Sequence, residues 1–197
     1  MQRHSFAARL TLALAACTTI SCGRSDKPAP TPAARTAHKA AIAAAAQDRL
    51  VLQYLVKDAA IVNARLPSFR RVSAGYAAAD TSVIWFAFFA GDTLIVLDET
   101  RRGPPGVEEN ARYFFRAGTL HYVVLDRIRT VGEPTPVRMR LAFGYDSAGV
   151  LSATSKNVND AAQPLDTVAD VSAIAARAKA LRVRVLTSVT TAGAHPR

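Results

Sequence analysis

The sequence predicts an α+β protein in which an N-terminal helix and a C-terminal helix flank an antiparallel β-meander of roughly seven strands. Two observations lead to this prediction: a hairpin pattern repeats through the middle of the chain, and helical periodicity appears on both sides of it. Hairpins that follow one another in sequence pair neighbouring strands, which gives a meander and not a parallel sheet.

Each copy of the repeated hairpin has an aromatic strand, a short turn that contains glycine and a return strand that contains leucine. The copies are residues 88–98, 114–126 and, more loosely, 143–153. Glycine adopts the positive φ that tight hairpin turns require, and the flanking residues favour strands. The pattern predicts strands at 69–79, 82–90, 93–99, 111–117, 119–127, 137–146 and 149–156.

The N-terminal helix is predicted from about Ala37 to Leu66. This segment is rich in alanine and contains neither glycine nor proline until Pro67 ends it. Its larger apolar side chains fall broadly on one side of a helix, which is typical of a helix that covers a sheet.

The C-terminal helix is predicted to begin near Pro164. Its apolar residues recur at steps of three and four: Val168, Val171, Ile174, Ala175, Ala178, Leu181 and Val185. Acidic residues stand near its start and basic residues near its end, as the helix dipole favours. Residues 183–189 also suit a short strand, and residues 190–197 are expected to form a frayed tail.

The first 21 residues have the order of an export signal. Arg3 and Arg9 precede an apolar run of about twelve residues, which is too short to span a hydrocarbon core, and small residues lead to Cys22. This arrangement resembles bacterial lipoprotein precursors, over the first two dozen residues only. The resemblance implies that the signal peptide is removed and that Cys22 is lipidated, with Cys17 as the alternative.

The residue after the lipidated cysteine bears on the compartment. Gly23 is not aspartate, and in lipoproteins of this type such a residue implies sorting to the outer membrane, with the protein facing the periplasm. Ordinary secretion into the periplasm is the alternative. Residues 22–36 read as a Pro/Ala-rich tether, and residues 37–189 as a single domain.

The chain is basic, with a formal net charge of +10. Loss of Arg3 and Arg9 with the signal would lower this to about +8. A basic exported protein can meet lipid headgroups, an anionic polymer or another envelope protein, whereas export separates it from nucleic acid.

Segment 82–90 is where a binding site is most expected, because it is apolar on both alternating faces. Either one helix covers each face of the sheet, or both helices cover one face and the other holds an apolar ligand. Trp85, Phe86 and Phe88 are the candidate ligand-binding residues. A filled core and an oligomer interface are the competing interpretations of the same pattern.

Catalytic signals are sparse. Asp98–Glu99 and Glu108–Glu109 flank the segment 100–107, and paired carboxylates can hydrolyse glycosidic bonds. Acidic residues beside arginines are more often solvated ion pairs, so no catalytic residue is assigned. His121 has no second histidine at ligand spacing, and neither a metal nor a cofactor is expected.

These features favour a non-catalytic cell-envelope lipoprotein that serves as a lipid-anchored binding or structural module. The alternative is a carrier or chaperone for an apolar molecule that uses a curved sheet lined by Trp85, Phe86 and Phe88. A hydrolase of cell-wall polymers is less favoured.

Overall fold

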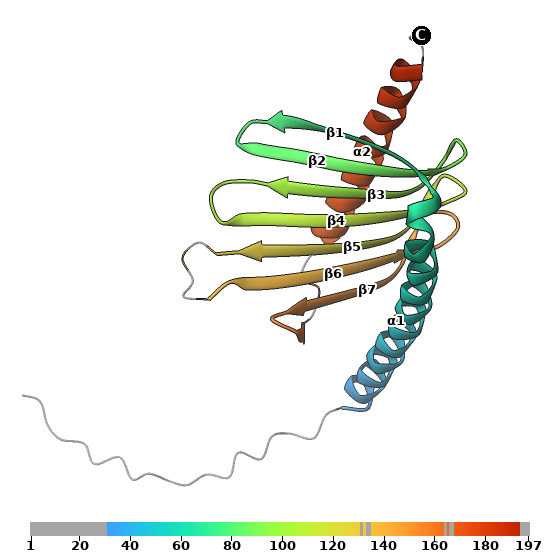
Figure 1. The fold of residues 1–197 in the computed structure, drawn as a ribbon. Helices are drawn as coiled ribbons and strands as arrows, with labels where there is room; N and C mark the ends of the chain where they lie inside the picture. The colour runs from blue at the N-terminus through green and yellow to red at the C-terminus, as the bar shows by residue number, and fades with distance from the viewer. Residues whose placement is uncertain (1–30, 131, 133–134, 164, 166–167, 194–197) are drawn as a thin grey trace, which may run out of the picture.

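The computed structural model describes residues 31–193, except 131, 133–134, 164 and 166–167. Helix α1 (Pro32–Arg65) leads through a short 3₁₀ turn, η1 (Leu66–Ser68), into the sheet, and helix α2 (Val168–Gly193) follows the sheet (Figure 1). The strands are β1 (Arg70–Ala78), β2 (Thr81–Ala90), β3 (Thr93–Arg102), β4 (Val107–Arg116), β5 (Thr119–Arg129), β6 (Val137–Tyr145), β7 (Leu151–Val158) and β8 (Ala161–Gln163).

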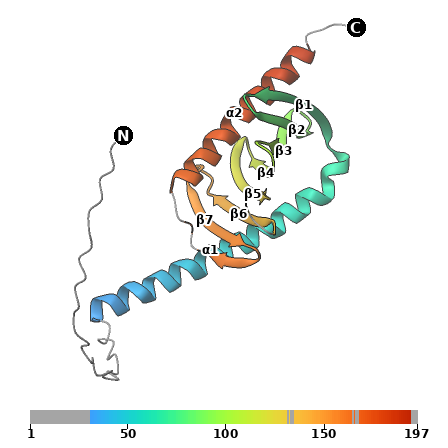
Figure 2. The same ribbon diagram turned by 90° about the vertical axis from the view of Figure 1, so that its left-hand side faces the viewer.

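The predicted α+β architecture is confirmed. The strands form one antiparallel sheet in chain order, from β1 at one edge to β8 at the other. The described part of the sheet has eight strands where roughly seven were predicted, because the three-residue β8 pairs with the end of β7. The sheet lies between the two helices, so that each helix covers one face (Figure 2).

Strands β3 and β4 are longer than predicted. Thr100, Arg102, Glu108 and Asn110 continue the ladder instead of forming a loop. Polar side chains on the two strands satisfy one another, since Thr100 donates a hydrogen bond to Asn110 and Arg102 pairs with Glu108. The turn is thereby confined to the few residues around the two prolines at 104 and 105.

The larger hydrophobic core lies under α2. Ile174, Ala178, Leu181 and Val185 of the helix are buried at steps of three and four. They pack on alternate residues of the strands: Trp85, Ala87, Phe89, Leu97, Tyr113, Val123, Leu125, Leu141 and Phe143. The apolar periodicity that predicted this helix is therefore the periodicity of its buried face.

The smaller core lies under α1, where Leu52, Leu55 and Ala59 contact the opposite face of the sheet. Gly144 on β6 allows this contact, because a Cβ atom there would lie 2.5 Å from Leu55 Cδ1. The absence of a side chain on one strand thus sets how closely α1 approaches the sheet.

The repeated hairpins share a further feature that the sequence pattern did not reveal. The register shifts by one residue beside the turn of each copy, between Phe88 and Phe89, Phe114 and Phe115, and Gly144 and Tyr145. Each return strand therefore has one extra residue: Ile95, His121 and Ser152. Such bulges bend a strand and increase its twist, and these three lie at the end of the sheet that α1 crosses.

The helix boundaries differ from the prediction at three points. Helix α1 begins at Pro32, five residues before the predicted start and within the predicted tether. Residues 183–189 are helical, not a strand, and α2 continues to Gly193, within the predicted tail. Among the described residues, neither helix is long and apolar enough to span a membrane.

Candidate functional site

Helix α1 leaves part of its face of the sheet uncovered. The helix crosses the end of the strands near the β2–β3 and β4–β5 hairpins, and the opposite end of that face lies beyond it (Figure 1). Between the helix and the uncovered sheet lies a half-open groove of about 530 Å³. Its lining on the sheet comes from strands β2 to β6, so the groove runs along the helix and across the strands.

The dimensions of the groove limit what it can hold. Five neighbouring strands span about 19 Å, since adjacent strands lie roughly 4.8 Å apart. An extended chain rises about 3.3 Å per residue, so a segment of about six residues fits along the groove.

Part of the lining of the groove is apolar. It consists of Val56, Ala59 and Ala60 on α1, with the half-buried Phe86 and Val124 on the sheet. Phe114 and Tyr122 stack below them with ring centroids 5.7 Å apart. Burial raises the pKa of the Tyr122 hydroxyl, which therefore stays neutral at physiological pH.

Charged residues of both signs lie among the apolar ones, since Asp98 and Arg112 stand between Phe86 and Val124 in one cross-strand row. Arg112 donates two hydrogen bonds to Asp98, at 2.5 and 2.7 Å, and a third to Asn63 of α1 at 3.1 Å. The bond to Asp98 raises the pKa of Arg112. Arg140 and Asp126 form a second, looser pair at 3.7 Å. These four residues thus balance in charge, and hydrogen bonds fix the pair of Arg112 and Asp98 in place.

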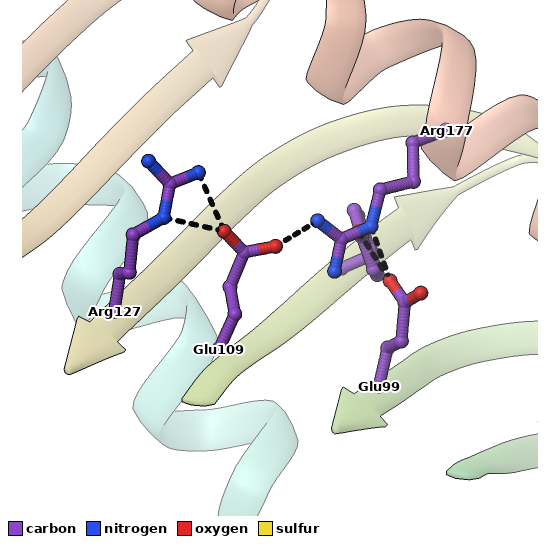
Figure 3. A network of polar contacts seen from close by, with 5 residues as sticks. Glu99, Glu109, Arg127 and Arg177 are labelled. Carbon is purple, nitrogen blue, oxygen red and sulfur yellow. Dashed lines mark hydrogen bonds and ion pairs between the residues drawn. The ribbon is translucent and has the colours of Figure 1, made fainter. Parts of the chain in front are cut away.

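A separate polar cluster lies under α2 on the opposite face (Figure 3). Arg177 of the helix donates to Glu99 on β3 at 2.6 Å and to Glu109 on β4. Tyr113 also donates to Glu99, at 2.8 Å, and Arg127 holds the second oxygen of Glu109. Glu99 is only 2% exposed and Glu109 8%.

The cluster favours the charged forms of Glu109 and Arg177. Burial opposes ionisation of Glu109, but Arg177 and Arg127 outweigh it and hold the pKa of that carboxylate below its usual value. Burial likewise opposes the charge on Arg177, and Tyr113 with the two glutamates reverses this effect and raises its pKa. Because each carboxylate is held by an arginine, the arrangement is that of a buried ion-pair network.

The acidic residues singled out in the sequence divide between the two faces. Glu99 and Glu109 belong to the network under α2, with Arg177 between them. Asp98 and Glu108 point to the α1 face, where Asp98 pairs with Arg112 and Glu108 with Arg102. No two of the four face each other across the groove.

The predicted apolar residues also divide between the faces. Trp85 is 1% exposed and lies in the core under α2, whereas Phe86 and Phe88 point to the α1 face. Only Phe86 lines the groove. Strict alternation along β2 separates the three side chains, so they do not line one cavity.

His121 is the extra residue of its bulge and lies beneath α1. Its Nε2 atom is 3.9 Å from Asp58 of the helix. Burial, together with the nearby Arg116, lowers the pKa of its imidazole. Within the described residues there is no group of histidine, cysteine, aspartate or glutamate side chains that could hold a metal ion. Cys17 and Cys22 lie outside the described residues.

The groove was not predicted, because its lining comes from six elements spread over residues 56–140. The only local signal was the alternation of charged and apolar residues in segment 107–116, which places Arg112 and Asn110 on the face opposite Tyr113. Comparison with known proteins adds nothing to this evidence: no protein-family model, curated protein or solved structure matches the chain. Arguments about function therefore depend on the chemistry of the site.

Proposed function

We propose that the chain is a non-catalytic, lipid-anchored module of the cell envelope that binds an extended polypeptide segment of a partner protein in the groove beside α1. The observation that supports this most is the lining of the groove, which crosses five strands and combines apolar side chains with charges of both signs. An extended peptide offers side chains of both kinds together with backbone hydrogen-bonding groups, and this matches a groove of mixed lining.

The charges favour this ligand over the other two classes considered. An anionic polymer would be repelled by Asp98 and Asp126 as much as it is attracted by Arg112 and Arg140. An apolar ligand would take the same four charges out of water without offering them hydrogen bonds. A peptide of mixed composition satisfies both the charged and the apolar side chains of the lining.

Ala60 provides a direct test, because its exposed side chain lies in the wall of the groove. A library of random peptides displayed on phage would be selected on the wild-type protein, and binding of the enriched peptides would be measured by calorimetry. We expect Ala60→Trp to weaken binding strongly, because its indole takes up space in the groove that the peptide would occupy. Ala45→Trp, at an exposed position of α1 outside the groove, should leave binding unchanged.

Two results would contradict the proposal. One is that no peptide is enriched, or that the enriched peptides bind Ala60→Trp as well as wild type. The other is that an oligomer of N-acetylglucosamine binds wild type and not Ala60→Trp while no peptide does, since the groove would then belong to a glycan.

The anchor is a separate part of the proposal and has its own test. It is supported by the order of basic, apolar and small residues before Cys22. Mass spectrometry of the protein from its native membrane should find an acylated N-terminal peptide that begins at Cys22. A chain that retains Met1 without lipid would contradict the anchor, although the groove could still bind a peptide.

A further inference from the structure

The open edge of the sheet at β1 is the other surface that invites a partner. A meander that does not close leaves two edges with unpaired backbone groups, and proteins usually shorten, bend or cover such edges. The edge at β8 is only three residues long. The edge at β1 is nine residues long, pairs with β2 in an unbroken register and contains no proline.

Nothing among the described elements continues the sheet beyond β1. In Figure 1 it is the outermost strand, and α2 passes behind it, across the face of the sheet. Ser73, Ala74 and Gly75, at the centre of the strand, are exposed and small, so a second strand can approach closely. The backbone of β1 is therefore available for one more partner strand.

The charges at the two ends of β1 indicate which partner fits. Arg70 and Arg71 begin the strand, and Asp80 stands in the exposed turn that follows it. When two copies of β1 pair antiparallel about Ala74, Arg70 and Arg71 of each copy lie opposite Ala78 and Ala77 of the other, at the end of the interface where Asp80 of that copy stands. A parallel pair would instead place arginine beside arginine, which is unfavourable. The strand is thus complementary to itself in one direction only.

We infer that two copies of this chain associate through β1, antiparallel about Ala74, to form one continuous sheet of sixteen strands. This association is independent of the groove, because the groove lining begins at β2 and lies on the α1 face.

A disulfide tests this arrangement with a defined register. The test uses a full-length chain with Cys17→Ser and Cys22→Ser. In this chain Ala74→Cys places the thiol of one copy opposite the thiol of the other, where the Cα atoms of paired strands lie about 4.5–5.5 Å apart. We expect Ala74→Cys to form a covalent dimer under mild oxidation. Ala77→Cys is the matched control, since its two copies would lie about 20 Å apart along the strands.

Light scattering after size-exclusion chromatography tests the association without a disulfide. We expect wild type to be a dimer, Ala74→Lys and Ala74→Glu each to be monomers, and an equal mixture of these two variants to dimerise again, because the opposed charges then attract. A monomeric wild type, or failure of Ala74→Cys to crosslink faster than Ala77→Cys, would overturn the inference. Dimers of both Ala74→Lys and Ala74→Glu would overturn it as well, since the interface would lie elsewhere.

Discussion

The two faces of the sheet are covered by helices of opposite character. Under α2, apolar side chains fill the space between helix and strands, and Arg177 closes a polar cluster there. Under α1, contact is limited to one end of the strands, and a groove lined by apolar and charged side chains lies beside it. The comparison teaches that a chain can close one face of a sheet with a packed helix and leave part of the other face open to solvent.

The largest effect is expected from breaking the network under α2. Arg177→Met leaves Glu99 and Glu109 without their shared partner beneath the helix. Removing one member of a buried ion pair typically costs about 3–5 kcal/mol, because the remaining charge is buried without compensation. We expect a loss of about 3 kcal/mol in the free energy of unfolding by urea.

Lys179→Met is the matched control for Arg177→Met. It removes a positive charge two residues away on the exposed side of the same helix, and we expect a change within about 0.5 kcal/mol. If the two variants lost equal stability, the network would not be what holds α2 to the sheet.

A smaller effect is expected on the α1 face. Gly144→Val introduces a side chain where Leu55 packs, and overpacking of this kind costs about 1–3 kcal/mol. The double variant Gly144→Val with Leu55→Ala should lose less than the sum of the two single changes, because the smaller residue makes room. Urea unfolding of all three variants measures this coupling.

Gly103→Ala is the control for the glycine change. A Cβ atom there meets only Thr81, at 4.0 Å, so the free energy of unfolding should change by less than about 0.5 kcal/mol. If the losses of unfolding free energy in Gly144→Val and Leu55→Ala were strictly additive in the double variant, Gly144 would not set the position of α1.

The smallest effect concerns pH and is confined to the α1 face. Burial, with Arg116 nearby, lowers the pKa of His121 in the folded protein, so the unfolded chain binds more protons below about pH 6.5. The neutral His121 therefore costs no stability above the pKa that it has in the unfolded chain. As the pH falls from that value towards its lower pKa in the folded protein, the free energy of unfolding decreases. Asp58 and Arg116 are the charged groups that face the imidazole.

His121→Gln removes the titrating group and retains a hydrogen-bonding side chain. Urea unfolding at pH 7 and pH 5 should show a smaller loss of stability in the variant than in wild type, by less than about 1 kcal/mol. Equal losses in the two proteins would mean that His121 is as easily protonated when folded as when unfolded.

Much of the fold was predictable because its signals are local. Glycine turns between aromatic and aliphatic strands set the order of the hairpins, and the step of Ile174, Ala178, Leu181 and Val185 marked the buried face of α2. The ends of β3 and β4 were missed because Thr100 and Asn110 resemble loop residues until their cross-strand bond is known.

The site was much less predictable, because it depends on which elements meet. Asp98 and Glu99 are neighbours in the chain, yet strand alternation sends one to Arg112 beside the groove and the other to Arg177 under α2. No pattern in segment 98–109 identifies the helix that covers each face. The same alternation separates Trp85 from Phe86, which the sequence had grouped in one candidate pocket.

The most direct test of the difference between the two faces compares the neighbouring residues Val123 and Val124 on β5. Val123 is 0% exposed under α2, whereas Val124 lines the groove. In a chain with Cys17→Ser and Cys22→Ser, each would be replaced by cysteine and the rate of reaction with a small thiol reagent measured under native conditions. We predict that Val124→Cys reacts in the folded state, while Val123→Cys reacts only when the protein opens. Equal protection of both thiols would contradict an accessible groove, and equal reactivity would contradict a closed core under α2.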